Sequence, residues 1–190
     1  VVQWLHDNLT DGCTARAINW TAMYKLFDVV RWLRRNEYEA YPGQALYRAV
    51  GAGYFDVEFL TGLDWRDDES GCTTNAMNAA AENGYLKIVK WLHLNRAATG
   101  AMNSAAKNDH LNIVKWLHQH RTEGRTTKAM DYAALNGHLK VVQWLHSNRR
   151  EGCTTRAMDF AVERGILEVV KWLHENRSEE CSTNAMDCAA

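Results

Sequence analysis

The chain has 190 residues, of which 46% are apolar and 24% charged, and this composition excludes an intrinsically disordered protein. Its 22 basic residues are balanced by 23 acidic ones, for a formal net charge of −1. It therefore lacks the basic excess on which sequence-independent nucleic-acid binding depends, and we expect no nucleic-acid partner.

Targeting signals and cysteine content indicate where the protein works. No stretch approaches the roughly 18 uninterrupted apolar residues that span a membrane. The N-terminal residues carry no signal-peptide pattern, so we expect no membrane association. Five cysteines, an odd number in a chain of this length, favour a reducing compartment. The sequence predicts a soluble protein of the cytoplasm or nucleus.

The sequence repeats itself from end to end. The dipeptide Trp-Leu begins at Trp4, Trp32, Trp91, Trp116, Trp144 and Trp172. Three of the intervals between successive copies are 28 residues. A second dipeptide, Ala-Met, begins at Ala76, Ala101, Ala129, Ala157 and Ala185. We expect about six to seven repeats, partial at both ends, to form a single domain over residues 1–190 that is an excerpt of a longer array.

Each repeat has the pattern of two short helices. Residues 129–134 favour a first helix with small side chains on one face, which Thr126 or Thr127 could cap. Gly137 suits the left-handed position at its end. Residues 139–146 carry the apolar stripe of a second helix. Helices of about nine residues are unstable alone in water, so the repeats are expected to stack into an all-α solenoid.

These residues resemble a known family. Residues 137–145, Gly-His-Leu-Lys-Val-Val-Gln-Trp-Leu, are similar to the second helix of ankyrin repeats, and residues 129–134 are similar to the first. Thr-x-Ala-Met-Asp replaces the family's Thr-Pro-Leu-His, a Trp enters the second helix, and the period is shorter than about 33 residues. Tetratricopeptide repeats fit the period less well. The resemblance implies a protein–protein interaction module whose first helices line a concave face.

The missing length falls on the connections between repeats. Leu145 ends one Trp-Leu dipeptide, and Met158 is the first apolar residue of the next repeat. The two are 13 positions apart, whereas a repeat of the family's length would need about 18. We therefore expect most of the family's β-hairpin fingers to be absent.

One repeat, residues 38–71, is irregular, and the connection that ends it is long. From Leu60 to Met77 is 17 positions, and residues 62–71 resemble a family finger. We expect this connection to be the most mobile one. Whether its Trp65 belongs to a contact element or to a plain insertion stays open.

Recurring histidines and cysteines are expected to be structural. Five histidines follow Trp-Leu directly: His6, His93, His118, His146 and His174. Since neighbouring helices lie roughly 8–10 Å apart, one histidine from each cannot converge on a zinc ion. The same spacing disfavours disulfides among Cys13, Cys72, Cys153 and Cys181, which we interpret as small packed side chains.

Catalytic motifs are absent from the sequence. We find no phosphate-binding loop, nucleophile elbow or paired carboxylates. Asp131, Asp159 and Asp187 recur too regularly to be catalytic. The resemblance places them where the family has a histidine that bonds a neighbouring loop. We expect no enzyme activity, no cofactor, no metal and no small-molecule substrate.

Candidate binding residues lie at positions that vary between repeats, while the rest of the repeat stays nearly constant. Three first-helix positions change from repeat to repeat, and several carry aromatic or arginine side chains, which often anchor interfaces. The partner-binding candidates, with the finger residue, are Trp20, Tyr24, Arg48, Trp65, Tyr132, Leu135, Phe160 and Arg164. Packing of Trp20 and Phe160 between repeats is the alternative.

The predicted function is a protein–protein interaction module that binds a partner protein on its concave first-helix face. A structural spacer, or a substrate-recruiting segment of a larger multidomain protein, is the alternative. The sequence does not reveal which protein is bound.

Overall fold

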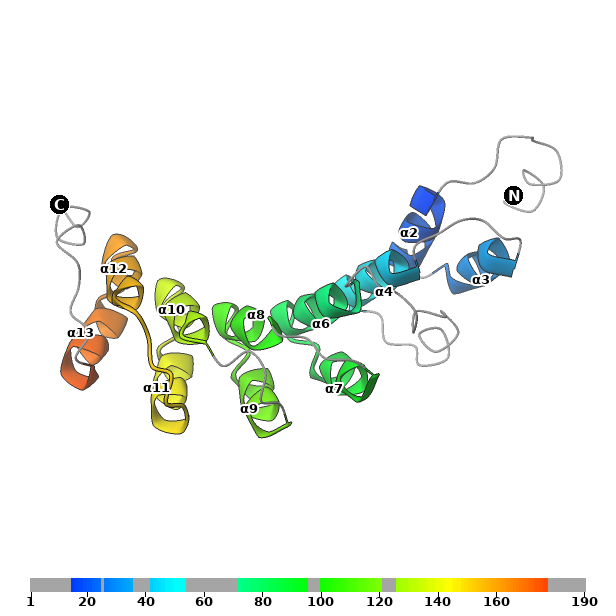
Figure 1. Cartoon of the computed structure of the whole chain (residues 1–190). Helices are drawn as coiled ribbons and strands as arrows, with labels where there is room; N and C mark the ends of the chain where they lie inside the picture. Colours follow the sequence, from blue (N-terminus) through cyan, green and yellow to red (C-terminus); the bar gives the residue numbers. More distant parts are fainter. Residues whose placement is uncertain are drawn as a thin grey trace. The chain divides into compact units, whose positions relative to one another are not determined.

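A computed structural model describes residues 15–24, 26–35, 42–53, 72–95, 100–120 and 126–177. All regular structure in these ranges is helical (Figure 1). The helices are α2 (Ala15–Met23), α3 (Phe27–Arg35), α4 (Pro42–Gly51), α6 (Cys72–Glu82), α7 (Leu86–Asn95), α8 (Ala101–Lys107), α9 (Leu111–His120), α10 (Lys128–Leu135), α11 (Leu139–Asn148), α12 (Thr155–Glu163) and α13 (Leu167–Asn176). The predicted all-α fold is confirmed.

Contacts group the chain into two compact units. Unit 1 comprises Val1–Ala80 and Lys87–Ala97, and unit 2 comprises Ala81–Leu86 and Ala98–Ala190. Helices α2, α3 and α4 belong to unit 1, α8 to α13 belong to unit 2, and α6 and α7 are divided between them. The single domain over residues 1–190 stays a prediction.

Unit 2 is built from two rows of helices. The first helices of its repeats, α8, α10 and α12, pack side by side in one row. Each also packs against the second helix that follows it, α9, α11 or α13, and α9 contacts α11 (Figure 1). The predicted helix pairs, stacked in chain order, are therefore present.

Unit 1 repeats this arrangement with fewer described elements. Helix α2 packs against α3, the second helix of its own repeat, and against α4, the first helix of the next. The core between α2, α3 and α4 contains the buried residues Ala22, Val30, Leu33, Leu46, Ala49 and Val50.

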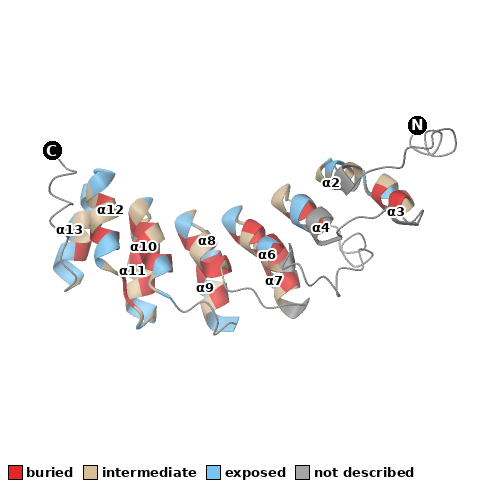
Figure 2. Cartoon of the chain, turned by 45° about the horizontal axis from the view of Figure 1, so that its top comes forward, coloured by how far each residue is buried: buried red, intermediate tan, exposed pale blue. Residues whose placement is uncertain are grey.

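The apolar spacing explains which helix faces are buried. In α10, Ala129, Met130, Ala133 and Ala134 are buried, and the small alanines allow neighbouring first helices to approach closely. The buried residues lie inside the stack in Figure 2, and exposed ones mainly at the helix ends. Leu145 of α11 is also buried, and a side chain of this size contributes about 1.5–3 kcal/mol.

The turn within each repeat needs a residue in the left-handed region. Gly137, with φ of 76°, ends α10 as predicted, and Gly84 has φ of 80°. Asp109 takes the equivalent position with φ of 60°, which Asp tolerates better than most residues.

A histidine ties each of two turns to the preceding repeat. The Nε2–H of His110 donates to the carbonyl oxygen of Glu82, and that of His138 to the carbonyl oxygen of Lys107, each at 2.9 Å. A Cβ on Gly84 would lie 2.8 Å from Cε1 of His110, so only glycine leaves room for the ring. In the last described repeat Ile166 replaces the histidine and packs against Gly137.

The expected threonine cap differs between two repeats. Thr154 caps α12, since its Oγ1 accepts a hydrogen bond from the N–H of Arg156 at 3.2 Å. Thr127 directly precedes α10 but makes no capping bond, so the prediction is wrong for Thr127, while the alternative cap Thr126 stays a prediction. Its backbone is already helical, with φ of −62° and ψ of −21°, whereas a cap needs extended geometry.

Two expectations lie outside the described residues. Trp65 and the long connection over residues 61–71 fall between the ranges that the structure describes. Their role as a finger or an insertion, and the expected mobility, stay predictions.

Two glycine substitutions test the histidine contact. Both Gly84→Ala and Gly165→Ala place a side chain at positive φ, which costs about 1–2 kcal/mol. Only Gly84→Ala also displaces the His110 ring, because nothing lies within 4 Å of a Cβ at Gly165. We expect urea unfolding to show a loss about 1 kcal/mol larger for Gly84→Ala. Equal losses would show that the His110 contact contributes nothing to stability.

Candidate functional site

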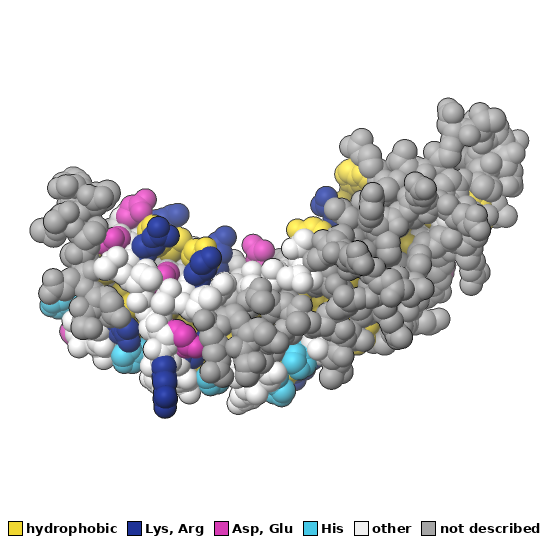
Figure 3. All heavy atoms as spheres, viewed as in Figure 1, with side chains coloured by type: hydrophobic (Ala, Val, Ile, Leu, Met, Phe, Trp, Pro, Cys, Tyr) yellow, Lys and Arg dark blue, Asp and Glu magenta, His cyan; other side chains and the backbone are white. Residues whose placement is uncertain are grey.

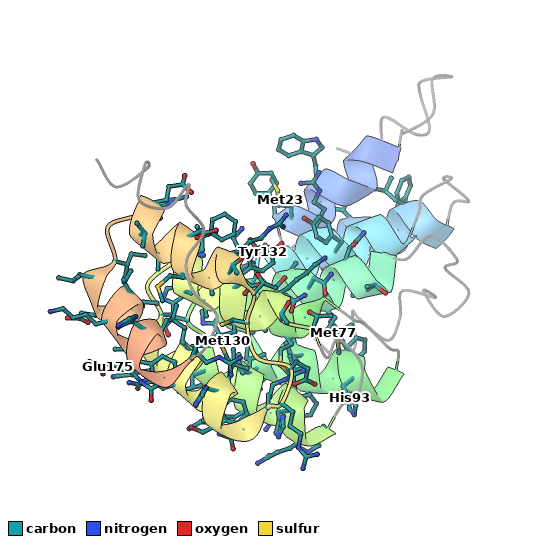
Figure 4. The ribbon with its side chains drawn as sticks, turned by 60° about the vertical axis from the view of Figure 1, so that its left-hand side comes forward. Met23, Met77, His93, Met130, Tyr132 and Glu175 are labelled. Carbon is teal, nitrogen blue, oxygen red and sulfur yellow. The ribbon has the colours of Figure 1, made fainter. Side chains whose placement is uncertain are left out.

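The first helices of unit 2 leave one face uncovered. In α10, Lys128, Tyr132 and Leu135 follow the i, i+4, i+7 spacing of one helix face, opposite the buried residues. Lys128 is exposed, whereas Tyr132 and Leu135 are half-buried. In Figure 4 Met130 lies inside the stack and Tyr132 at its edge.

Helix α12 presents the same positions beside it. Arg156, Glu163 and Arg164 are exposed, and Phe160 is half-buried. Because α10 packs against α12, the two helices form one surface, which we call the first-helix face of unit 2. It consists of Lys128, Tyr132, Leu135, Arg156, Phe160, Glu163 and Arg164. The structure thus brings together four residues that the sequence singled out: Tyr132, Leu135, Phe160 and Arg164.

Unit 1 carries an exposed pair of aromatic rings. Trp20 is 53% exposed and Tyr24, just after α2, is 59% exposed. Their rings stack with centroids 5.8 Å apart and planes 12° from parallel. Trp20 is therefore not packed away between repeats, as the alternative required.

Helix α4, packed against α2, adds a cation and a third ring. Arg48 is exposed, and its guanidinium lies 5.9 Å from the ring centroid of Tyr47. Tyr47 is 38% exposed and was not among the predicted residues. It occupies the position that holds Asp131 in a regular repeat, which the sequence assigned to the constant frame.

Asp131 bonds the next repeat. Asp131 is 6% exposed, and its carboxylate accepts two hydrogen bonds from Thr154, from the N–H at 2.8 Å and from the hydroxyl at 3.0 Å. The repeated aspartate therefore serves structure, as its regular recurrence predicted.

Burial has the largest effect on the pKa of the Asp131 carboxyl group. Burial raises its pKa above the ordinary value of 3.8, although bonds from Thr154 and Thr127 and the charge of Arg156 act in the opposite direction. A group whose pKa rises on folding stabilises the folded state most at low pH, and that contribution is lost as the pH rises through the folded pKa.

The repeated histidines contact tryptophans of the following repeat. His118 meets Trp144 edge to face at 5.2 Å between centroids, and His146 meets Trp172 in the same way at 5.1 Å. Over the described ranges, no three His, Cys, Asp or Glu residues are grouped as metal ligands. Cys153 is buried and is not part of a disulfide, as predicted for a packed thiol.

A buried arginine was missed by sequence reasoning. The side chain of Arg149, 6% exposed, donates two hydrogen bonds to the carboxylate of Glu151, at 3.1 and 3.2 Å. Its Nη1 also approaches the sulfur of Met102, at 2.7 Å. The recurring Asn-Arg pairs at 148–149 and 176–177 were the available signal. This arginine ties the end of α11 to α8 and is structural.

Substitutions of Asp131 test its role. Asp131→Ala leaves the Thr154 N–H without its acceptor, so we expect a loss of about 1–3 kcal/mol in the free energy of unfolding. Asp131→Asn keeps an oxygen for that N–H and removes the buried charge, so it should stay close to wild type at neutral pH.

The pH dependence gives a second readout for this residue. Relative to Asp131→Asn, the wild-type chain should lose stability as the pH rises from below 3.8 through the folded pKa. Denaturant unfolding across that range measures the difference. A constant difference between the two proteins at all pH values would contradict the pKa shift.

Comparison with known proteins agrees with this architecture. The family model described as "Ankyrin repeats (3 copies)" matches residues 76–156 and, in an overlapping alignment, residues 102–187. The two alignments together span more than half of the chain. A search of curated proteins finds no match. None of the described helices is long and apolar enough to cross a membrane. With its helix pairs, its glycine turns and this match, the chain belongs to the ankyrin repeat family.

Proposed function

We propose that this chain is a protein-binding module that holds its partner on the first-helix faces of its repeats. Ankyrin repeats generally serve as protein–protein interaction modules, and the family is typically non-enzymatic. Beyond this general role of the family, we assign the binding face and the residues on it.

The observation that carries the proposal is the exposure of Trp20 and Tyr24. Because the two exposed rings stack on each other, they form contiguous apolar surface, which marks interaction sites more often than a single exposed side chain does. Rings of this kind bury a large area at an interface and often dominate its binding energy. Both lie at first-helix positions that vary among the repeats.

The same position carries aromatic rings in unit 2. Tyr132 and Phe160 occupy the position of Trp20 in two other repeats, next to the exposed Arg164. A spacer needs no aromatic side chain at its variable positions, so this pattern favours binding over the spacer role.

Charge and thiol chemistry support a protein partner in a reducing compartment. The net charge of −1 suits a protein partner better than a nucleic acid. The reduced thiol of Cys153, which is not part of a disulfide, accords with the cytoplasm or nucleus.

Substitution of the exposed pair tests the proposal. We expect Trp20→Ala/Tyr24→Ala to reduce capture of partner protein from cell extract, measured by cross-linking and mass spectrometry, by at least about tenfold. Because both side chains are mostly exposed, the melting temperature should change little.

A matched control is available on a second helix. Leu167 of α13 is 60% exposed, so Leu167→Ala removes a similarly exposed apolar side chain from the second helix of a repeat. Capture should survive this substitution. Capture lost equally in both variants, or in neither, would contradict binding through the first-helix face.

A further inference from the structure

We propose that the first-helix face of unit 2 selects a partner segment that combines carboxylate side chains with apolar ones, an acidic peptide. This inference rests on the proposed function and names the chemistry of the partner at one edge of the surface. Lys128 and Arg156 would bind the carboxylates, and Tyr132 and Phe160 would bind the apolar side chains.

The four side chains form a compact two-by-two arrangement. Lys128 and Tyr132 lie four residues apart on α10, and Arg156 and Phe160 lie four residues apart on α12, so each cation has an aromatic ring one turn further on. Helices α10 and α12 pack side by side. Figure 3 shows Lys and Arg side chains beside hydrophobic ones above these two helices.

Lys128 and Arg156 are both exposed, and neither has an ion-pair partner within 4 Å among the described residues. The nearby carboxylate of Asp131 is buried and already accepts two hydrogen bonds from Thr154. Its interaction with Arg156 is a through-space one. The charges are therefore available to an approaching anion.

The two rings are likewise unengaged. Within the described part of the chain, the rings of Tyr132 and Phe160 stack on no other ring and face no cation. On the second helices, Lys140 and Trp144 have the same four-residue spacing, but the ring of Trp144 already meets His118. Among these three helices, an unpaired cation with an unstacked ring one turn further on is thus found on α10 and α12 but not on α11.

The small number of cations favours a peptide over a nucleic acid. Sequence-independent nucleic-acid binding depends on many Lys and Arg contacts to phosphates, whereas the first-helix face of unit 2 carries only three cations, Lys128, Arg156 and Arg164. The exposed Glu163 at the other end of the same face would also repel a continuous phosphate backbone. A peptide can place a carboxylate near each cation and keep its remaining length neutral.

Peptide selection tests the inference. Random peptides displayed on phage would be selected on the intact, immobilised chain and sequenced. Peptides enriched on the wild-type chain should carry an excess of Asp and Glu together with apolar residues. Selection on Lys128→Glu/Arg156→Glu should instead enrich basic peptides, because charge complementarity sets the preference.

Affinity of one enriched peptide, measured by fluorescence anisotropy, supplies the quantitative test. Lys128→Glu/Arg156→Glu should weaken binding at least about tenfold. Lys140→Glu/Lys171→Glu makes the same charge change on exposed second-helix residues and should weaken it less than about twofold. Tyr132→Ala/Phe160→Ala should also weaken binding.

A milder variant separates binding from folding. Because Arg156 influences Asp131, its reversal to Glu carries a stability cost, so Lys128→Gln/Arg156→Gln is measured beside it, with thermal melts of every variant. The neutral variant should keep the wild-type melting profile and still bind several-fold more weakly.

Four outcomes would overturn the inference. These are enrichment of no peptide, enrichment of peptides without acidic residues, equal loss in the second-helix control, and tighter binding of a phosphopeptide or a single-stranded oligonucleotide than of the acidic peptide. None of these outcomes bears on partner capture through Trp20 and Tyr24 in unit 1. The capture experiment can therefore still support the proposed function when this inference is wrong.

Discussion

The constraint on which the whole structure depends is the shortness of its helices. They range from seven residues in α8 to eleven in α6, and isolated helices of this length are marginal in water. Each therefore persists only by burying apolar surface against its neighbours. The alanine-rich first helices and the Val-Val-x-Trp-Leu second helices supply that surface. Stability in such an array is a sum of repeats and their interfaces, so a defect in one interface acts locally first.

Polar bonds between repeats set how the helix pairs join. His110 and His138 donate to carbonyl oxygens at the ends of the preceding first helices, and Asp131 accepts two bonds from Thr154. Thr154 in turn caps α12, so one aspartate orders the start of the next repeat's helix. Each of these side chains is occupied by a structural bond. The constant positions of the repeat are therefore poor candidates for function.

First and second helices differ in the contacts that their aromatic side chains make. On the second helices, Trp144 and Trp172 meet histidines of the preceding repeats, which holds the rings within the stack. On the first helices, Trp20 and Tyr24 touch mainly each other and face solvent. Aromatic area that is not used internally can be buried by a partner. This difference supports the assignment of binding to the first helices.

The sequence by itself determined the all-α repeat fold, the helix pairs, the turn at Gly137 and the structural role of Asp131, because periodicity and backbone preference act over a few residues. Only the tertiary structure decided which side chains are free. Thr126 and Thr127 were both predicted as caps of α10, yet the backbone of Thr127 is already helical, whereas the extended backbone at Thr154 allows it to cap α12. Tyr47 stands at a position of the constant frame yet is exposed, and the recurrence of Arg149 after Asn148 did not reveal that its side chain is buried. Exposure depends on the helices that pack alongside, and packing of that kind is not encoded in the local pattern of one repeat.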